Sequence, residues 1–189
     1  EENQYLNLIE DILNENTEFI GRNGKTLSIF GSCMHFSLEN NKIPLLTTKK
    51  LAIKTCLKEL LWFIKGDTNN KNLQDKKVHI WDGNSSKDFL NKIGLGHLEE
   101  NDCGACYGFQ WRHFGAEYKD RFTDYTDKGV DQLKWLINEI KQNPNSRRLI
   151  LSAWNVSDLD KMALPPCHIL SQFYVDQQLN TLSCQLYQR

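Results

Sequence analysis

The sequence predicts an α+β fold in which helices come first and strands follow. Two observations favour this class: apolar residues recur at helical spacing in three stretches of residues 1–140, and three short strand-like segments fill the last third. With 40% hydrophobic and 25% charged residues, the 189-residue chain can bury a core of ordinary size. We therefore expect residues 1–189 to belong to a single domain.

The first element is an amphipathic helix, because the apolar residues between positions 5 and 13 lie on one helical face. The stretch 27–38 alternates between apolar and polar residues and predicts a strand. Its alternation changes phase at Gly31–Ser32, which predicts a kink there. A second helix is expected over residues 53–64. The run Leu60–Ile64 is apolar on every side, so we expect this helix to be the central, buried one.

The remaining elements follow from the same patterns. A third helix is predicted over residues 130–140, and it stops before Asn143-Pro144-Asn145. Apolar and β-branched residues then predict three strands, over Leu149–Ala153, Ile169–Val175 and Leu182–Gln188.

Composition narrows the classes of partner and compartment. A net charge of -1 does not favour a nucleic acid or an anionic membrane as partner, and the longest apolar run is far shorter than a membrane helix requires. The six cysteines are too sparse for a disulfide scaffold, and no apolar signal segment opens the sequence. We therefore expect a cytoplasmic protein.

Three short motifs resemble known sites but lack the required context. Gly24–Thr26 ends like a phosphate-binding P-loop, yet Phe19 stands where that loop needs a glycine. Cys103 and Cys106 have the spacing of a metal or redox pair, but no second pair or suitably spaced histidines accompany them. We expect two free cysteines in a loop and no metal. With Tyr107 this stretch also matches a papain-type signature, which leaves a cysteine protease as a rival although no histidine follows at the required distance.

A fourth set of residues fits one chemical task. Pro165-Pro166 fixes the approach to Cys167, which opens a predicted strand, so its thiol sits at the rigid end of an element. Arg147 and Arg148 precede another strand, and Arg189 lies on the polar face of the last one. Guanidinium groups bind phosphate through paired hydrogen bonds, and a nearby cation raises the ionised fraction of a thiol. These residues predict a nucleophile beside a phosphate site.

Glu59 is the candidate for acid–base chemistry. It adjoins the apolar run of the second predicted helix, where a carboxyl group can exchange protons near neutrality. The alternative is a partly exposed position beside Lys58, and the sequence leaves both open.

Eight segments, in order and nearly end to end, resemble the thymidylate synthase family. They are Pro44–Lys50, Glu59–Gly66, Ile80–Asp82, Tyr107–Tyr118, Gly129–Leu133, Ser146–Arg148, Met162–His168 and Ser183–Arg189. The sequence is similar to the N-terminal part of that family's catalytic domain, about two-thirds of a domain of ordinary size.

The resemblance implies reductive methylation of dUMP to dTMP, with 5,10-methylenetetrahydrofolate giving the carbon and the hydride. Cys167 matches the nucleophile that adds to carbon 6 of the pyrimidine. Glu59 matches the glutamate that organises protons and water, and Tyr107 matches the tyrosine near the proton that leaves carbon 5. The family's fold is a kinked mixed β-sheet packed with helices, and this sheet forms the homodimer interface.

The resemblance also implies which residues bind substrates. Arg189 matches the phosphate ligand beside the nucleophile, and Arg147 and Arg148 match a pair that reaches the other subunit's site. Arg22 and His168 complete the nucleotide-binding set, although the loop around Arg22 is one residue shorter than the family pattern. The folate pocket is expected to include Ile80, Trp81 and Asn84.

Some features of the family lie outside this sequence. Members continue beyond the position of Arg189 with residues that read the pyrimidine edge, so a deoxycytidylate hydroxymethylase stays an alternative, as does an inactive, truncated subunit. In some synthases a dihydrofolate reductase domain precedes the synthase domain, and the 189 residues do not include that region. We expect a 189-residue chain that ends at Arg189 not to turn over unaided.

Overall fold

The computed structural model describes residues 1–21 and 24–189 and divides the chain into two compact units, Glu1–Ala52 and Ile53–Arg189. Arg22, a predicted substrate ligand, lies outside the described residues. The assignment of residues 1–189 to a single domain stays a prediction.

The first unit contains the predicted opening helix. Helix α1 (Asn3–Glu15) ends at Asn16, whose left-handed backbone (φ 48°) stops the helical turn. A β-hairpin of β1 (Glu18–Gly21) and β2 (Gly24–Leu27) follows, and a single 3-10 turn, η1, covers Glu39–Asn41. Gly24–Thr26 therefore lies in an antiparallel strand, which is not the strand-to-helix loop that a P-loop needs.

The strand expected over residues 27–38 is wrong beyond Leu27, where β2 ends. The backbone of His35 shows why, because its N–H donates to Gln4 Oε1 (2.8 Å) and its carbonyl accepts from Gln4 Nε2 (2.6 Å). These groups are therefore taken by a side chain of α1 and not by a neighbouring strand. Gly31 adopts a positive φ of 89°, so the chain does bend where the alternation changes phase.

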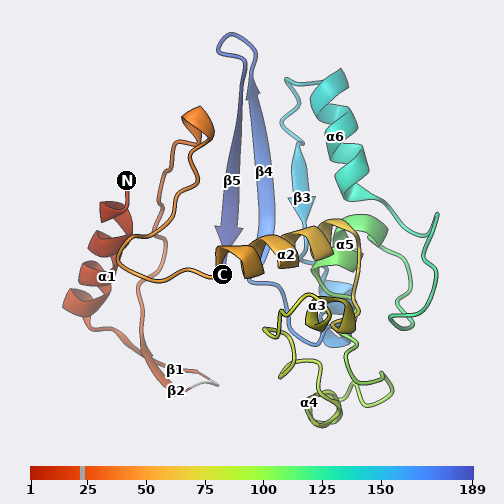
Figure 1. Ribbon diagram of the computed structural model, residues 1–189. Coiled ribbons are helices and arrows are strands. Elements are labelled where there is room, and N and C mark those ends of the chain that lie inside the picture. The colour runs from red at the N-terminus through yellow and green to blue at the C-terminus, as the bar shows by residue number, and fades with distance from the viewer. Residues whose placement is uncertain (22–23) are drawn as a thin grey trace. The chain divides into compact units, whose positions relative to one another are not determined.

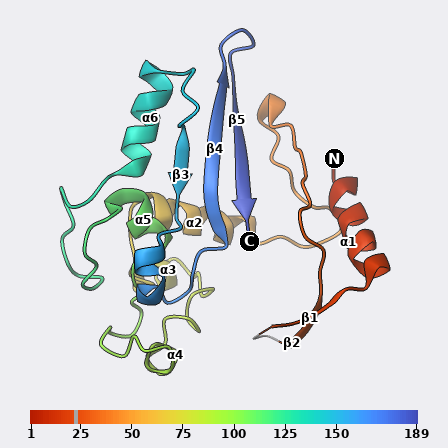
Figure 2. The same cartoon turned by 180° about the vertical axis from the view of Figure 1, so that it is seen from behind.

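The second unit combines short helices with one antiparallel sheet (Figures 1 and 2), which confirms the α+β class. Its helices are α2 (Ile53–Ile64), α3 (Lys71–Gln74), α4 (Lys87–Lys92), α5 (Tyr107–His113), α6 (Gln132–Gln142) and the 3-10 helix η2 (Val156–Lys161). Its strands are β3 (Ile150–Ser152), β4 (His168–Asp176) and β5 (Thr181–Gln188), in the order β3-β4-β5. Among the described residues, no helix is long and apolar enough to cross a membrane.

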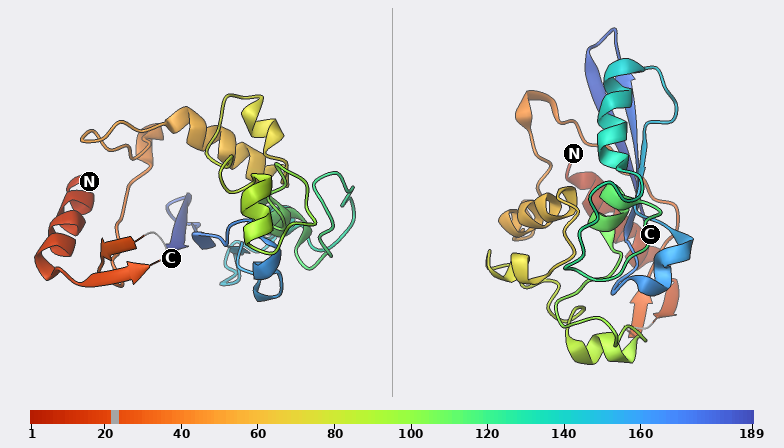
Figure 3. Two further views of the ribbon diagram at one scale, coloured as in Figure 1. Left: turned by 90° about the horizontal axis from the view of Figure 1, so that it is seen from below. Right: turned by 90° about the vertical axis from the view of Figure 1, so that its right-hand side faces the viewer.

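Helix α5 lies at the centre of this unit, between α2 and strand β3 (Figure 3). Its first residue, Tyr107, packs into an aromatic cluster with Trp62 and Phe63 of α2 and with Trp81. A second cluster joins α6 to β3 through buried leucines, among them Leu136. The first cluster packs α5 against α2, and the second packs α6 against β3, so together they connect the helices of this unit to its sheet.

Helix α2, which was expected to be the central, buried helix, is only partly buried in the second unit, so this expectation is wrong. Trp62 and Phe63 are buried, but Leu57, Leu60 and Leu61 are 54%, 44% and 47% exposed. Helix α2 contacts α5 and α3 within this unit, so only the side that meets them is covered. The described strand pairs are all antiparallel, and a kinked mixed sheet stays a prediction.

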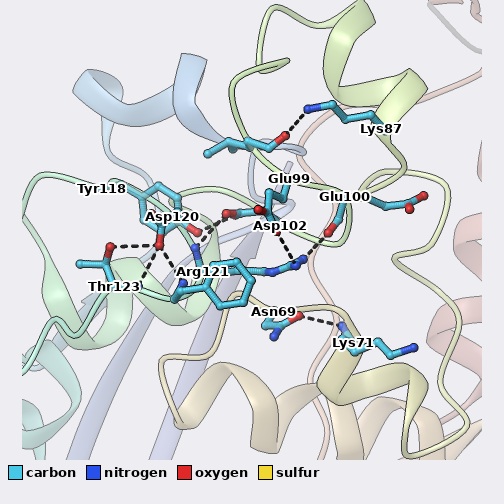
Figure 4. Close-up of polar contacts among 12 residues, drawn as sticks. Asn69, Lys71, Lys87, Glu99, Glu100, Asp102, Tyr118, Asp120, Arg121 and Thr123 are labelled. Carbon is cyan, nitrogen blue, oxygen red and sulfur yellow. Dashed lines mark hydrogen bonds and ion pairs between the residues drawn. The ribbon is translucent and has the colours of Figure 1, made fainter.

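A buried carboxylate fixes the loop that leads into α5. Asp102 is fully buried and accepts hydrogen bonds from Tyr118 Oη (2.6 Å) and from the backbone N–H groups of Gly104 and Arg121 (both 2.8 Å), as Figure 4 shows in part. Burial raises the pKa of Asp102, although the three hydrogen bonds act in the opposite direction. Because three donors converge on one side chain, the backbone just before Tyr107 has little freedom to move.

Candidate active site

Cys167, the predicted nucleophile, lies directly before strand β4, as its place at the start of a predicted strand led us to expect. Its side chain is partly exposed, and its carbonyl accepts a hydrogen bond from the backbone N–H of Arg189 at 3.0 Å. The pairing of β4 with β5 shifts register between His168 and Leu170, and such irregularities turn side chains out of a regular ladder. The backbone of Cys167 is therefore fixed to the residue that follows β5, while its side chain remains partly exposed.

Tyr107 reaches the backbone of Cys167 from the start of α5. Its Oη accepts hydrogen bonds from the N–H of Cys167 at 2.6 Å and of His168 at 3.4 Å. The ring stacks on Phe63 with a centroid separation of 4.5 Å. Burial raises the pKa of Tyr107, so the hydroxyl keeps its proton at neutral pH and can still donate it to a ligand. Two residues that are 60 positions apart in the chain thus meet at the predicted site.

Arg189 is held beside the same cysteine by two carbonyl oxygens. Its Nε donates to Pro166 O and its Nη2 to Pro165 O, both at 3.0 Å. The guanidinium carbon also lies 5.8 Å from the ring centre of Trp154. Among the described residues, Nη1 has no acceptor, so this arginine retains a donor for an anion next to Cys167.

Glu59 is joined to the site through Trp81. The indole N–H of Trp81 donates to Glu59 Oε1 at 2.7 Å, and the Glu59 side chain is partly exposed. The Trp81 ring lies 6.3 Å from Phe63 and 6.4 Å from Tyr107, edge to face in both cases. Glu59, Trp81, Tyr107 and Cys167 therefore form one continuous series of contacts.

The other predicted site residues are more exposed. Ile80 is 51% exposed and Asn84 is partly exposed, whereas Trp81 between them is only 5% exposed. His168 is exposed, with its ring 6.0 Å from that of Tyr107.

Arg147 and Arg148 lie apart from this series, on the exposed connection between α6 and β3. Neither guanidinium group makes a hydrogen bond to any described residue. Both arginines are therefore available to a group outside this part of the chain.

Cys103 and Cys106 are packing residues. Both are fully buried in the aromatic cluster, and Cys106 precedes the first turn of α5. Burial raises the pKa of Cys103, which disfavours the reactive thiolate form. Both thiols are free. In the part of the chain that is described, no group of three or more potential ligands could hold a metal ion. A papain-type role for Cys106 is also disfavoured, because that nucleophile must reach solvent.

Two contributors to the geometry were not predicted as site residues. Trp154 lies under the guanidinium of Arg189, and Phe63 packs against both Tyr107 and Trp81. Phe63 falls inside a segment that resembles the family, but its apolar side chain signals only packing. No local signal in the sequence links Trp154 to Arg189, because their proximity arises from the fold.

The arrangement combines the parts that nucleophilic addition to an anionic substrate requires. A thiol lies at an element end, an arginine with a free donor lies beside it, and a buried hydroxyl and a carboxylate lie within the same cluster. Together these groups can bind an anion, add sulfur to an electrophilic carbon and relay protons.

Comparisons with known proteins agree with this arrangement. A family model described as thymidylate synthase matches residues 3–189. The chain is 58% identical over 190 residues to a bifunctional dihydrofolate reductase-thymidylate synthase of Zea mays, covering all of this chain and 36% of that protein. Proteins of the same name from Leishmania amazonensis and Paramecium tetraurelia are 53% and 54% identical, again over the whole chain, and it covers 36% and 40% of them. The chain thus spans well under half the length of these relatives. It belongs to the thymidylate synthase family.

Proposed function

We propose that the protein containing this chain is a thymidylate synthase, a methyltransferase that converts dUMP to dTMP with 5,10-methylenetetrahydrofolate as cosubstrate. The observation that carries the proposal is the contact between Tyr107 and the backbone of Cys167, with Arg189 held beside them. The family match over residues 3–189 and the names of the relatives support the same reaction.

In the proposed reaction, the Cys167 thiolate forms a bond to carbon 6 of the pyrimidine, and the electron pair of the 5,6 double bond makes carbon 5 nucleophilic. Carbon 5 forms a bond to the one-carbon unit and then loses its proton, and the electron pair left behind breaks the bond between that unit and the folate. The Tyr107 hydroxyl keeps its own proton, so in this proposal it acts as a hydrogen-bonding relay near carbon 5 and not as the base. The one-carbon unit then takes a hydride from the folate and becomes the methyl group, while the sulfur–carbon bond breaks, the 5,6 double bond re-forms and the thiolate returns. Arg189 binds the phosphate and so fixes the ring above Cys167.

The folate cosubstrate supplies the one-carbon unit and the hydride when it is bound. Exposed Ile80 and partly exposed Asn84 offer apolar and polar contacts for a ring system of this kind. Trp81 is nearly buried and donates to Glu59, so we propose that it serves the folate pocket chiefly by orienting that carboxylate.

The decisive test is release of tritium from dUMP labelled at carbon 5. Because the proton leaves carbon 5 only after the one-carbon unit is attached, we expect release that depends on added methylenetetrahydrofolate. The experiment uses the full-length protein that contains this chain. Labelled dCMP is the matched control and should release no more tritium than a sample without enzyme.

Each alternative gives a different result in this assay. A deoxycytidylate hydroxymethylase would release tritium from labelled dCMP at least as fast as from dUMP. An inactive subunit would release none from either nucleotide. Either outcome would reject the proposed reaction.

We further propose that the protein is a homodimer whose interface includes the sheet of the second unit. Strand β5 is exposed along its whole length, and on one of its faces Leu182 and Leu186 are each about half exposed. Such a face on an open sheet is more than a monomer usually leaves uncovered. Arg147 and Arg148 are exposed and unpaired within the described residues, as a role in the partner's site requires. A cytoplasmic location remains our expectation from the cysteine content.

Mixing two inactive variants tests the shared site. One variant is Cys167→Ala, and the other combines Arg147→Ala with Arg148→Ala. In a mixed dimer, one site has an intact Cys167 from the second variant and intact arginines from the first, so we expect turnover to return after co-expression. If the arginines serve their own subunit's site, every site lacks one component, and the mixed sample will stay as inactive as its parents.

A further inference from the structure

We propose that Asp82 is a positioning residue of the active site, which holds the turn 79–85 so that the Trp81 indole stays bonded to Glu59. The structural part of this inference stands on contacts within the second unit. Its consequence for catalysis rests on the proposed function.

Three side chains converge on the Asp82 carboxylate. Oδ1 accepts hydrogen bonds from Asn70 Nδ2 and Gln74 Nε2, both at 2.9 Å, and Oδ2 lies 2.9 Å from His79 Nδ1. Asn70 is fully buried at the start of α3, and Gln74 is the last residue of that helix. The carboxylate therefore ties the turn to both ends of α3.

A second set of bonds holds the same turn from its other side. The carbonyl of Trp81 accepts from the backbone N–H of Ser85 at 3.0 Å and from Ser85 Oγ at 2.9 Å. Asn70 Nδ2 also lies 3.0 Å from Ser85 Oγ, so one buried amide links both sets. The turn is thus held at Asp82 by its side-chain hydrogen bonds and at the Trp81 carbonyl by Ser85. From this turn the Trp81 indole N–H donates to Glu59.

A carboxylate suits this position because it offers only acceptors to donors that arrive from two elements. The hydrogen bonds from Gln74 and Asn70 lower the pKa of Asp82, so the group remains ionised at neutral pH. Without the carboxylate, the buried Asn70 amide would lose an acceptor and the turn would lose its attachment to Gln74. The Trp81 side chain, one residue away, would then no longer be held on Glu59.

Hydrogen exchange of the Trp81 indole N–H tests the structural part without any turnover. The protein's indole signals are recorded by NMR, and the Trp81 signal is assigned by its loss in Trp81→Phe. In Asp82→Ala we expect exchange at this site to be at least about 10-fold faster, because the hydrogen bond to Glu59 opens more often. The indole of Trp62, which donates to Asn69 O at 3.2 Å, gauges general unfolding and should change by less than about 3-fold.

Two further variants complete the set. Asp82→Asn keeps one acceptor oxygen for Asn70 and Gln74, so its effect on Trp81 exchange should be smaller than that of Asp82→Ala, and it serves if the alanine variant does not fold. Asp75→Ala is the matched control, because Asp75 is exposed beside α3 and makes no side-chain hydrogen bond to a described residue. It should leave the exchange of Trp81 unchanged.

A double-mutant cycle on kcat/KM tests the catalytic consequence. Because a displacement of about 1 Å in an active site costs on the order of 100-fold, we expect Asp82→Ala to lower kcat/KM by about 10-fold to 100-fold. In a Trp81→Phe background the bond to Glu59 is already absent, and the same substitution should cost less than about 3-fold.

Three results would overturn the proposal: unchanged exchange of Trp81 in folded Asp82→Ala, equal acceleration of Trp62, or the same loss of kcat/KM in both backgrounds. Failure of the proposed function looks different. In that case the wild-type protein does not turn over dUMP at all, and the exchange measurements still decide whether Asp82 holds Trp81.

Discussion

Cys167→Ala is expected to abolish turnover of dUMP, with kcat lower by about 10⁴-fold to 10⁶-fold, since removal of a covalent nucleophile leaves only binding and orientation. Folding should be unaffected, because the side chain is partly exposed and the bonds that fix this residue come from its backbone. Tritium release from labelled dUMP measures the loss. Cys56→Ala is the control, since Cys56 is an exposed thiol on α2 and should leave the rate unchanged.

Covalent capture gives the same test a second readout. In 5-fluoro-dUMP the carbon 5 position carries fluorine, which cannot leave as a proton does, so with methylenetetrahydrofolate added the reaction should stop with the nucleotide bound to sulfur. Mass spectrometry of the full-length protein is expected to find this adduct on the peptide that contains Cys167. An adduct that persists in Cys167→Ala would show that another group is the nucleophile.

Local patterns in the sequence were sufficient for the long elements. Helix α1 and helix α6 each carry apolar residues on one face, and strands β4 and β5 each contain several apolar residues within eight or nine positions. Helices α3, α4 and α5 escaped prediction, because four to seven residues are too few for a periodic pattern to emerge.

The two wrong expectations share a cause, which is that burial and pairing depend on partners far away in the sequence. The alternation of residues 28–38 describes an extended chain, but Gln4 occupies the backbone groups of His35 that a ladder would use. The apolar surface of α2 predicts complete burial, yet the second unit covers only the side that carries Trp62 and Phe63.

The candidate site was found largely by resemblance, and its geometry was not available from the sequence. The pair Pro165-Pro166 before a cysteine marks Cys167 as a candidate, but nothing local indicates that Tyr107 reaches its backbone from 60 residues away. The same holds for Asp82, whose three partners come from residues 70–79 and meet only because α3 folds back on the turn.

The approach of Tyr107 to Cys167 depends on a close contact between two backbones. The N–H of Ala105 donates to Lys161 O at 2.9 Å, and the N–H of Ala163 donates to Cys103 O at 3.1 Å, so these segments pair like a short antiparallel ladder. Gly104 lies between them with a positive φ of 68°. A Cβ atom at this position would overlap the carbonyl oxygen of Lys161, which belongs to the backbone and cannot turn aside.

Gly104→Ala is therefore expected to destabilise the protein by about 2–5 kcal/mol, since a left-handed backbone strain and a steric overlap act together. Gly115→Ala separates the two effects: Gly115 has a similar φ of 79° but no atom within 4 Å of an added Cβ, so it should cost only about 1–2 kcal/mol. Urea denaturation of both variants measures the difference.

The same pair of variants also links the fold to the chemistry. The two segments must separate to admit the methyl group of Gly104→Ala. If the Gly104 contact aligns Tyr107 with Cys167, this variant should have a lower kcat for dUMP even at urea concentrations where it is fully folded. Gly115→Ala should keep its kcat under the same conditions. Equal stability of the two variants would show that the backbones at Gly104 yield easily, and an unchanged kcat in Gly104→Ala would show that Tyr107 keeps its place by its aromatic contacts with Phe63 and Trp81 alone.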